Sequence, residues 1–230
     1  LASRYNQFYL ATKGGCTDDM PSTNASTHEW SRENLTMGIE TSLKRLGRDR
    51  VDILQLHNPT IGEVEEGGMV NALNDLRAQG MTQWIGISTT LPDLPTFLEY
   101  GAFDVMQIPY SALQREHEDW ITKVAEAGIG TIIRGGVAQG EYEVGTGSID
   151  TWSKFEEANL NELLEKGESR SAFVLRFTLA HPAIDTIIVG TTKFEHLREN
   201  VAVATGRPLS GEVYAEAKRR LDAIGESPAP

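Results

Sequence analysis

The sequence has almost none of the features that mark secreted or membrane-spanning proteins. Its 230 residues include one cysteine, Cys16, so no disulfide can form within the chain. This cysteine usage is typical of a reducing compartment, and we expect a cytoplasmic location. No apolar run is long enough to span a bilayer, so we expect no membrane partner.

Positive charge is also scarce. The chain carries 21 Lys and Arg against 33 Asp and Glu, which gives a formal net charge of −12. An acidic surface repels polyanions, and no local cluster of Lys and Arg stands out. We therefore expect no nucleic-acid partner.

Metal-ligand spacing is a third feature that is missing. His28, His117 and His181 lie in helical or loop stretches without the close spacing of ligands that metal sites show. Cys16 has no histidine close to it in the sequence. We predict no metal site and no metal partner.

Short runs rich in Val, Ile and Leu alternate with helical patterns, which indicates a parallel β-sheet covered by helices. An open doubly wound sheet and a (β/α)8 TIM barrel both fit this order. A dinucleotide-binding doubly wound sheet carries G-x-G-x-x-G in its first strand–helix turn, and its absence favours the barrel. The expected strands are residues 8–12, 51–57, 83–88, 103–110, 130–136 and 185–192.

Polar residues at the strand ends favour the same fold, because barrel enzymes build their sites at the C-terminal ends of the strands. We predict one domain over residues 1–230, an α/β barrel with about six of its eight strands present. The two missing strand–helix units are expected before "LASRY", which resembles the end of a helix. The polar residues at the strand ends are Lys13, His57, Ser88, Tyr110, Arg134 and Thr191.

Lys13 and His57 are the candidates for chemistry. A lysine at a strand end is often a solvated residue whose stem lies along the surface, and a lone histidine is often structural. The two residues end neighbouring parallel strands, however, where their side chains can converge on one pocket. That pairing favours an active site.

The stretch "VGTTKFEHLREN" favours a phosphate-binding site. Gly190 lets a ligand approach the backbone, Thr191 and Thr192 offer hydroxyls, and a helix begins directly after them. Helix capping by threonine without a ligand fits equally well. Arg134 and Gly136 in "RGGVAQG" lie in the adjacent position, so the two stretches together favour a nucleotide.

Gln107 and Tyr110 in "VMQIPYS" suit a flat heterocycle, since a ring can stack on it and an amide can bind a carboxamide. Taken alone, Tyr110 fits the protein core better than a cofactor site.

These residues together resemble the aldo/keto reductase family. The resemblance rests on "FYLATKGG", "SLKRLGRDRVDILQLHNP", "IGIS", "VMQIPYS" and "GTTKFEHLREN", which follow in family order from Phe8 to about Val201. It implies a (β/α)8 barrel that binds NADP(H), or in some members NAD(H), and reduces aldehydes and ketones or oxidises the corresponding alcohols.

The resemblance also implies roles for single residues. Lys13 and His57 correspond to the active-site lysine and histidine of the family. Ser88 and Gln107 correspond to residues that hold the nicotinamide carboxamide, and Tyr110 to the ring that stacks on the nicotinamide. The clamp on the adenosine phosphate corresponds to Gly190–Asn200, with Thr191, Thr192, Lys193, His196, Glu199 and Asn200 in it.

The sequence departs from the family pattern at three places. Thr89 replaces the asparagine that usually follows Ser88. Gly190 and His196 replace basic residues that grip the 2′-phosphate, so NADP(H) is preferred with Lys193 as substitute, and NAD(H) is possible. The aspartate and the proton-donating tyrosine of the family precede the stretch at Phe8, and residues 1–230 do not contain them.

Three functions stay open from the sequence. The first is an NAD(P)H-dependent reductase of small carbonyl substrates, inactive as residues 1–230 alone. The second is a non-catalytic nucleotide-binding or regulatory barrel. The third is a lyase that forms a Schiff base at Lys13.

Overall fold

The computed structural model describes residues 4, 7–17, 27–141 and 145–229. Contacts between Cα atoms divide the chain into two compact units, Leu1–Gln107 and Ile108–Pro230. The prediction of one domain over residues 1–230 therefore stays a prediction. Within the described ranges, no helix combines the length and the apolar character needed to cross a bilayer.

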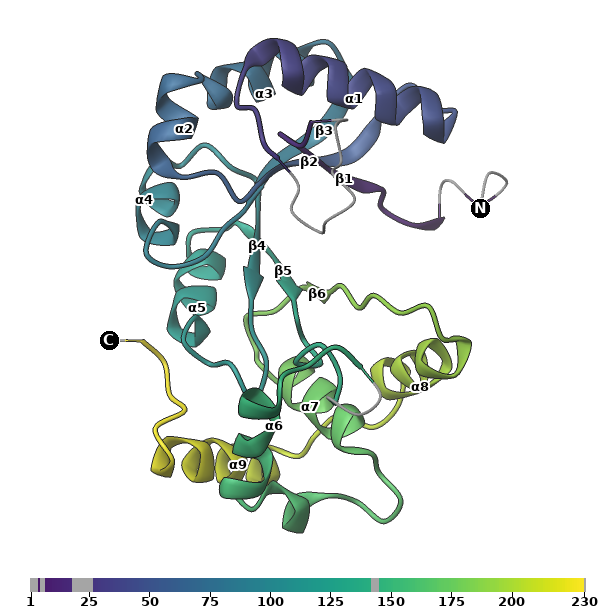
Figure 1. Cartoon of the computed structure of the whole chain (residues 1–230), viewed down its shortest axis with the longest axis vertical. Helices are drawn as coiled ribbons and strands as arrows, with labels where there is room; N and C mark the ends of the chain where they lie inside the picture. The colour runs from purple at the N-terminus through teal and green to yellow at the C-terminus, as the bar shows by residue number, and fades with distance from the viewer. Residues whose placement is uncertain (1–3, 5–6, 18–26, 142–144, 230) are drawn as a thin grey trace. The chain divides into compact units, whose positions relative to one another are not determined.

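The first unit is built on parallel strands that pair in chain order, β1 with β2, β2 with β3, and β3 with β4 (Figure 1). Leu54 and Leu56 of β2 and Ile85 and Ile87 of β3 are almost fully buried, which explains why these strands read as apolar runs. The strands are β1 (Ala11–Gly14), β2 (Val51–His57), β3 (Thr82–Ser88) and β4 (Val105–Pro109). The helices are α1 (Arg32–Leu46), α2 (Ile61–Glu66), α3 (Met69–Ala78) and α4 (Leu94–Glu99).

Helix α1 shows how the sequence fixes one element. The Ser31 side chain accepts a hydrogen bond from the Asn34 N–H, and Gly47 ends the helix in the left-handed region at φ 63°. Leu35, Ile39 and Leu43 form its buried face. Gly14 lets this face approach β1, because a Cβ atom there would lie 2.3 Å from Cδ1 of Leu35.

The second unit contains two strands and five α-helices in its described part. Strands β5 (Gly130–Arg134) and β6 (Thr186–Ile187) are parallel neighbours, with Ile132 opposite Thr186. The helices are α5 (Glu118–Glu126), α6 (Ile149–Glu157), α7 (Arg170–Leu179), α8 (Phe194–Thr205) and α9 (Gly211–Ala223), with a 3₁₀ turn at Leu160–Leu163.

The predicted α/β class is confirmed, since the described residues form an open sheet of six parallel strands in chain order. Strands β1 and β6 differ most from the predicted ranges. Strand β1 begins at Ala11, because the N–H of Leu10 is taken by the Asp52 carboxylate at 2.7 Å. Strand β6 covers only Thr186–Ile187 of the predicted 185–192, and most of the residues that follow it are exposed.

Arg115 ties the C-terminal residues to α5 within the second unit. It is 1% exposed, and its Nε donates to Oε2 of Glu118 at 2.6 Å. Its Nη1 donates to Oδ1 of Asp222 at 2.7 Å and to the carbonyl oxygen of Glu226 at 2.8 Å. The planar guanidinium suits this set of acceptors, whereas an ammonium is a point charge.

We predict that Arg115→Met lowers the free energy of unfolding by about 1–3 kcal/mol, because it removes the hydrogen bonds that these acceptors receive, although Glu118 keeps its ion pair with Lys218. Urea unfolding followed by circular dichroism measures the change. Arg219→Ala, which removes an exposed ion pair with Glu216, is the control and leaves the unfolding midpoint unchanged. Equal midpoints for Arg115→Met and the wild type would contradict the assignment.

Candidate functional site

The strand register places Lys13 and His57 on one face of the sheet. Lys13 lies opposite Gln55 in the β1–β2 pairing, and Gln55 precedes His57 by two residues. Side chains alternate between faces along a strand, so all three share a face. Lys13 and His57 also lie at the C-terminal ends of their strands, as the sequence predicts for a common site. Their catalytic roles stay predictions.

Ser88 and Gln107 continue the same row. The register pairs His57 with Ser88 and Ser88 with Gln107. Gln107 Nε2 donates to Ser88 Oγ at 3.3 Å, and Ser88 Oγ donates to Oδ1 of Asn58 at 2.9 Å. Ser88 and Gln107 are buried, so a hydroxyl and an amide of the row lie in a water-poor place.

The predicted set does not include Gln55 and Asn58. Gln55 is 1% exposed, and its Oε1 has no hydrogen-bond partner among the described residues. The sequence feature that could have identified Gln55 as a site residue is a single amide within an otherwise apolar strand. Asn58 has φ 55°, a left-handed conformation that asparagine tolerates. The stretch "HNP" at the end of a strand is the sequence feature that could have identified Asn58.

Thr89 stands where the family pattern has asparagine. Its N–H donates to the carbonyl oxygen of Gln107 at 3.0 Å, and its hydroxyl donates to the carbonyl oxygen of Thr90 at 3.4 Å. The Thr89 hydroxyl is thus bonded to the backbone of the next residue. Gln55 is the amide that shares a strand and a face with His57.

His57 lies beside Cys16 and His28. Its Nδ1 is 3.2 Å from Sγ of Cys16 and 3.3 Å from Nε2 of His28. From sequence spacing alone, we predict no metal-ligand set that includes Cys16 or His28. Sequence spacing does not reveal that the two residues meet at His57 in the fold. An isolated antiparallel bridge between Cys16 and His28 brings them together.

Tyr110 and Arg134 belong to the second unit. Tyr110 is 1% exposed, with its ring centroid 5.3 Å from that of His181 and 6.4 Å from that of Phe177. Burial raises the pKa of Tyr110 well above 10. This packing is typical of a core residue. For Tyr110 to stack on a nicotinamide ring, the side chains packed around its ring would have to move apart.

Arg134 ends β5 and has a buried Nε without a hydrogen-bond partner among the described residues. Burial lowers the pKa of its guanidinium. Gly136 has a packing reason to be glycine, since a Cβ there would lie 2.7 Å from Cγ2 of Ile187. Arg134 is therefore the better candidate for a ligand contact.

The stretch from Gly190 to Lys193 is exposed. The Lys193 N–H donates to Oγ1 of Thr191 at 3.1 Å, and no side chain caps the first turn of α8. The free N–H groups of that turn suit an anion. Thr192 is exposed beside them, and His196, Glu199 and Asn200 are half-buried on α8.

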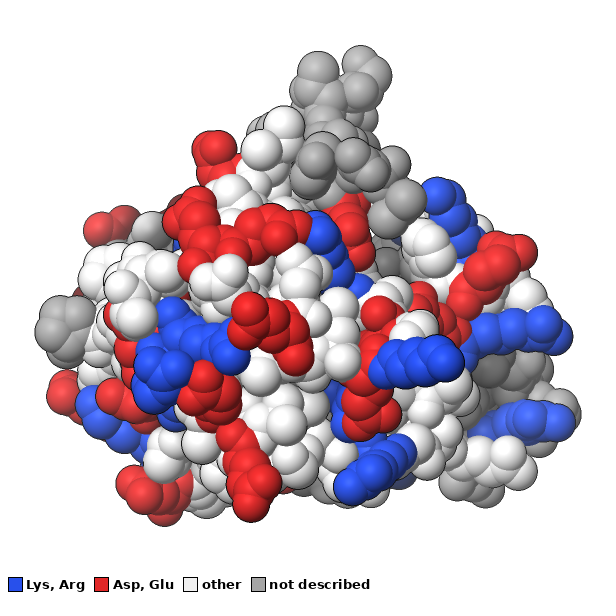
Figure 2. Space-filling model, turned by 90° about the horizontal axis from the view of Figure 1, so that it is seen from below, with Lys and Arg blue, Asp and Glu red and all other residues white. Residues whose placement is uncertain are grey.

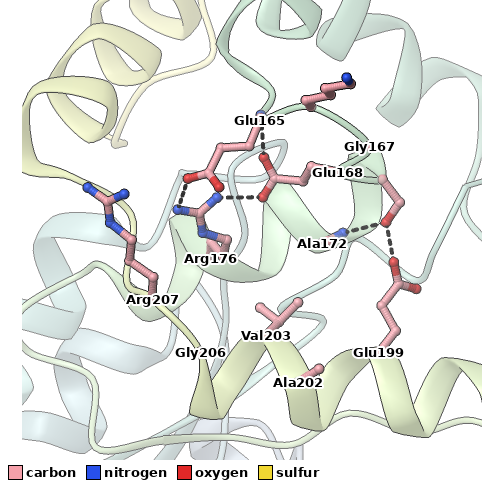
Figure 3. A pocket seen from close by; sticks show the side chains of 12 residues that line it. Glu165, Gly167, Glu168, Ala172, Arg176, Glu199, Ala202, Val203, Gly206 and Arg207 are labelled. Atoms are coloured by element: carbon pink, nitrogen blue, oxygen red, sulfur yellow. Dashed lines mark hydrogen bonds and ion pairs between the residues drawn. The ribbon is translucent and has the colours of Figure 1, made fainter.

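Glu199 lines a cavity of about 370 Å³ between α8 and the turn before α7 (Figure 3). Its Oε1 accepts a hydrogen bond from Oγ of Ser169 at 2.5 Å. On the opposite side of the cavity, Arg176 contacts Glu165 and Glu168, each at 2.8 Å. The cavity thus offers carboxylates and a hydroxyl to a polar ligand.

Charges of both signs are interspersed on the face shown in Figure 2. The described residues on that face form no continuous patch of Lys and Arg. The absence of a nucleic-acid partner stays a prediction.

A sequence profile of the aldo/keto reductase family matches residues 1–222, and the chain belongs to this family of oxidoreductases. It is 28% identical to the uncharacterized oxidoreductase YqkF of Bacillus subtilis, over 92% of this chain and 73% of the relative. It is 26% identical to the NADH-specific methylglyoxal reductase of Escherichia coli, over 75% of this chain and 60% of that enzyme.

The fold matches that of aldo-keto reductase AKR11C1 from Bacillus halodurans in its holo form. The TM-score is 0.81 at 24% identity, and the match covers 96% of this chain and 75% of that one. The predicted barrel type is thereby confirmed, with six parallel strands described in this chain.

We predict that His117 makes the second unit sensitive to acid. Burial, and then the charge of Arg134, lowers the pKa of His117 from 6.5 to about 4. The unfolded chain therefore binds this proton at higher pH than the folded chain, and stability falls as the pH drops through this window. His117→Gln flattens that decline in urea unfolding measured from neutral pH to about pH 4. Parallel curves for the two proteins would contradict the role of His117.

Proposed function

We propose that the chain contributes to an NAD(P)H-dependent oxidoreductase that reduces small aldehydes or ketones to alcohols. The observation that carries the proposal is the row of Lys13, Gln55, His57, Ser88 and Gln107 on one face at the strand ends. Family membership supports a nicotinamide cofactor.

The residues of the row fit a nicotinamide. A carboxamide needs one acceptor and one donor, and the buried Oε1 of Gln55 is an acceptor without a partner among the described residues. Ser88 and Gln107 would hold the same group. When bound, the nicotinamide supplies the hydride.

His57 and Lys13 then have different tasks. A neutral His57 donates a hydrogen bond to the substrate carbonyl oxygen and orients it. Lys13 carries a positive charge beside the proton donor, which in this family is a tyrosine. That charge favours the tyrosinate and lowers a pKa that is ordinarily near 10. Lys13 therefore tunes the acid and is not the acid itself.

The family's aspartate and tyrosine correspond to positions before the stretch at Phe8, and the proposed reaction requires both. We therefore expect this segment alone to bind the cofactor without appreciable turnover. A protein that binds cofactor without reducing carbonyls even when that upstream sequence is present would be the non-catalytic alternative.

The central experiment compares residues 1–230 with a longer protein in which a segment bearing the family's aspartate and tyrosine precedes residue 1. Both are expected to bind NADPH in a fluorescence titration, and only the longer protein oxidises it in the presence of carbonyl substrates. Lys13→Met in the longer protein lowers kcat by about 100-fold or more, because proton transfer loses its tuned acid. Cofactor binding that is unaffected by both Ser88→Ala and Gln107→Leu would contradict the proposed site.

Lys193 tests the preference for NADP(H). Its ammonium, at the start of α8, is the basic group proposed to contact the 2′-phosphate. Lys193→Ala is expected to weaken NADPH about 10-fold, equivalent to about 1.4 kcal/mol, and to leave NADH unchanged. The relative from Escherichia coli is named for NADH, and tighter binding of NADH than of NADPH by the wild type would assign NAD(H) to this chain instead.

A further inference from the structure

Three side chains with metal-binding atoms converge at the ends of β1 and β2. Sγ of Cys16 and Nε2 of His28 both contact Nδ1 of His57, at 3.2 Å and 3.3 Å. One ligand atom of each residue lies within 4.8 Å of the others. We propose that Cys16, His28 and His57 form a site for a divalent transition metal, and that Zn²⁺ is the ion that it suits best.

The separations fit a tetrahedral zinc site. Zinc binds thiolate at about 2.3 Å and imidazole at about 2.0–2.1 Å, so tetrahedral angles place S and N about 3.5 Å apart and two N atoms about 3.3 Å apart. The contacts at His57 are within a few tenths of an ångström of these values. The two separations at Nδ1 of His57 thus suit the ion, and the third, between the ligand atoms of Cys16 and His28, is at most 4.8 Å.

The contacts at Nδ1 of His57 also favour a cation over hydrogen bonds alone. An imidazole nitrogen carries either one proton or one in-plane lone pair, so it serves one hydrogen-bond partner well. Here two potential ligand atoms lie close to the same nitrogen. A metal ion can satisfy the three groups together, because a thiolate and each imidazole nitrogen have a lone pair that binds it.

The backbone holds Cys16 and His28 in place. The bridge between them is formed by the Thr17 N–H to the Thr27 carbonyl at 3.0 Å and the Glu29 N–H to the Gly15 carbonyl at 2.9 Å. This pattern makes Cys16 and His28 a non-hydrogen-bonded pair, the arrangement in which facing side chains lie closest.

The ring of His28 is oriented by Trp30. The two rings stack with their centroids 5.4 Å apart and an interplanar angle of 3°. Gly15 makes room for Trp30, because a Cβ atom at φ 108° would lie 2.2 Å from its ring. The glycine, the tryptophan and the histidine thus form one support for the site.

The ligand types decide which ion binds. A thiolate and two imidazoles favour zinc and related transition metals, whereas Mg²⁺ and Ca²⁺ prefer oxygen ligands. Three protein ligands leave a fourth position for water, and Cys16 and His57 are only half-buried. The proposal does not depend on carbonyl reduction, and its test requires no turnover.

The test is a titration of the reduced, metal-free chain with Co²⁺, followed by displacement with Zn²⁺. We expect a single tetrahedral Co²⁺ site with a thiolate-to-cobalt charge-transfer band that Zn²⁺ removes. Cys16→Ser abolishes this band, and His28→Gln weakens Zn²⁺ binding by at least about 10-fold, as expected for loss of a ligand. His196→Gln, which changes a histidine of α8, is the matched control and binds as the wild type does.

Zinc X-ray absorption of the wild-type protein gives a second readout. This measurement uses no variant, so misfolding of a variant does not affect it. One sulfur and two imidazole nitrogens in the zinc shell support the site. A shell of oxygen and nitrogen without sulfur, or unchanged Zn²⁺ affinity in both Cys16→Ser and His28→Gln, overturns the proposal. Circular dichroism of each variant verifies that it is folded.

Discussion

Parallel pairing of β1 to β4 is the constraint on which the site depends. Each hydrogen-bonded step of the ladder fixes both the face and the level of a side chain, and a slip by one residue would turn His57 away from Lys13. Helix α1 supports this register, because Gly14 lets its buried leucine and isoleucine side chains rest on β1. The chemistry proposed here thus follows from backbone pairing more than from any single side chain.

The sequence was informative where local patterns and register decide the structure. The apolar runs predict the strands, and Ser31 and Gly47 predict the ends of α1, because caps act within one helical turn. Leu46, in the last turn of the helix, is 39% exposed. Tyr110, which taken alone fits the core, is indeed enclosed by the packing of the second unit, and the stacking role that the family resemblance implies stays a prediction.

Long-range pairing accounts for most of what the sequence does not reveal. Cys16 and His28 meet through an antiparallel bridge, and both reach His57, which lies far along the chain. Gln55 is recognisable only as an amide in an apolar strand, and its unpartnered oxygen requires coordinates. If the proposed metal site and the proposed active site are both correct, His57 belongs to each, and its two ring nitrogens would divide the roles.

Magnetisation transfer from the nicotinamide protons of a bound cofactor to the protein, measured by NMR on this chain, tests the central claim most directly. The account predicts intermolecular contacts with His57, Ser88 and Gln107, since one sheet face carries all three side chains at the strand ends. Contacts confined to residues outside this row, with cofactor bound at saturation, would contradict it.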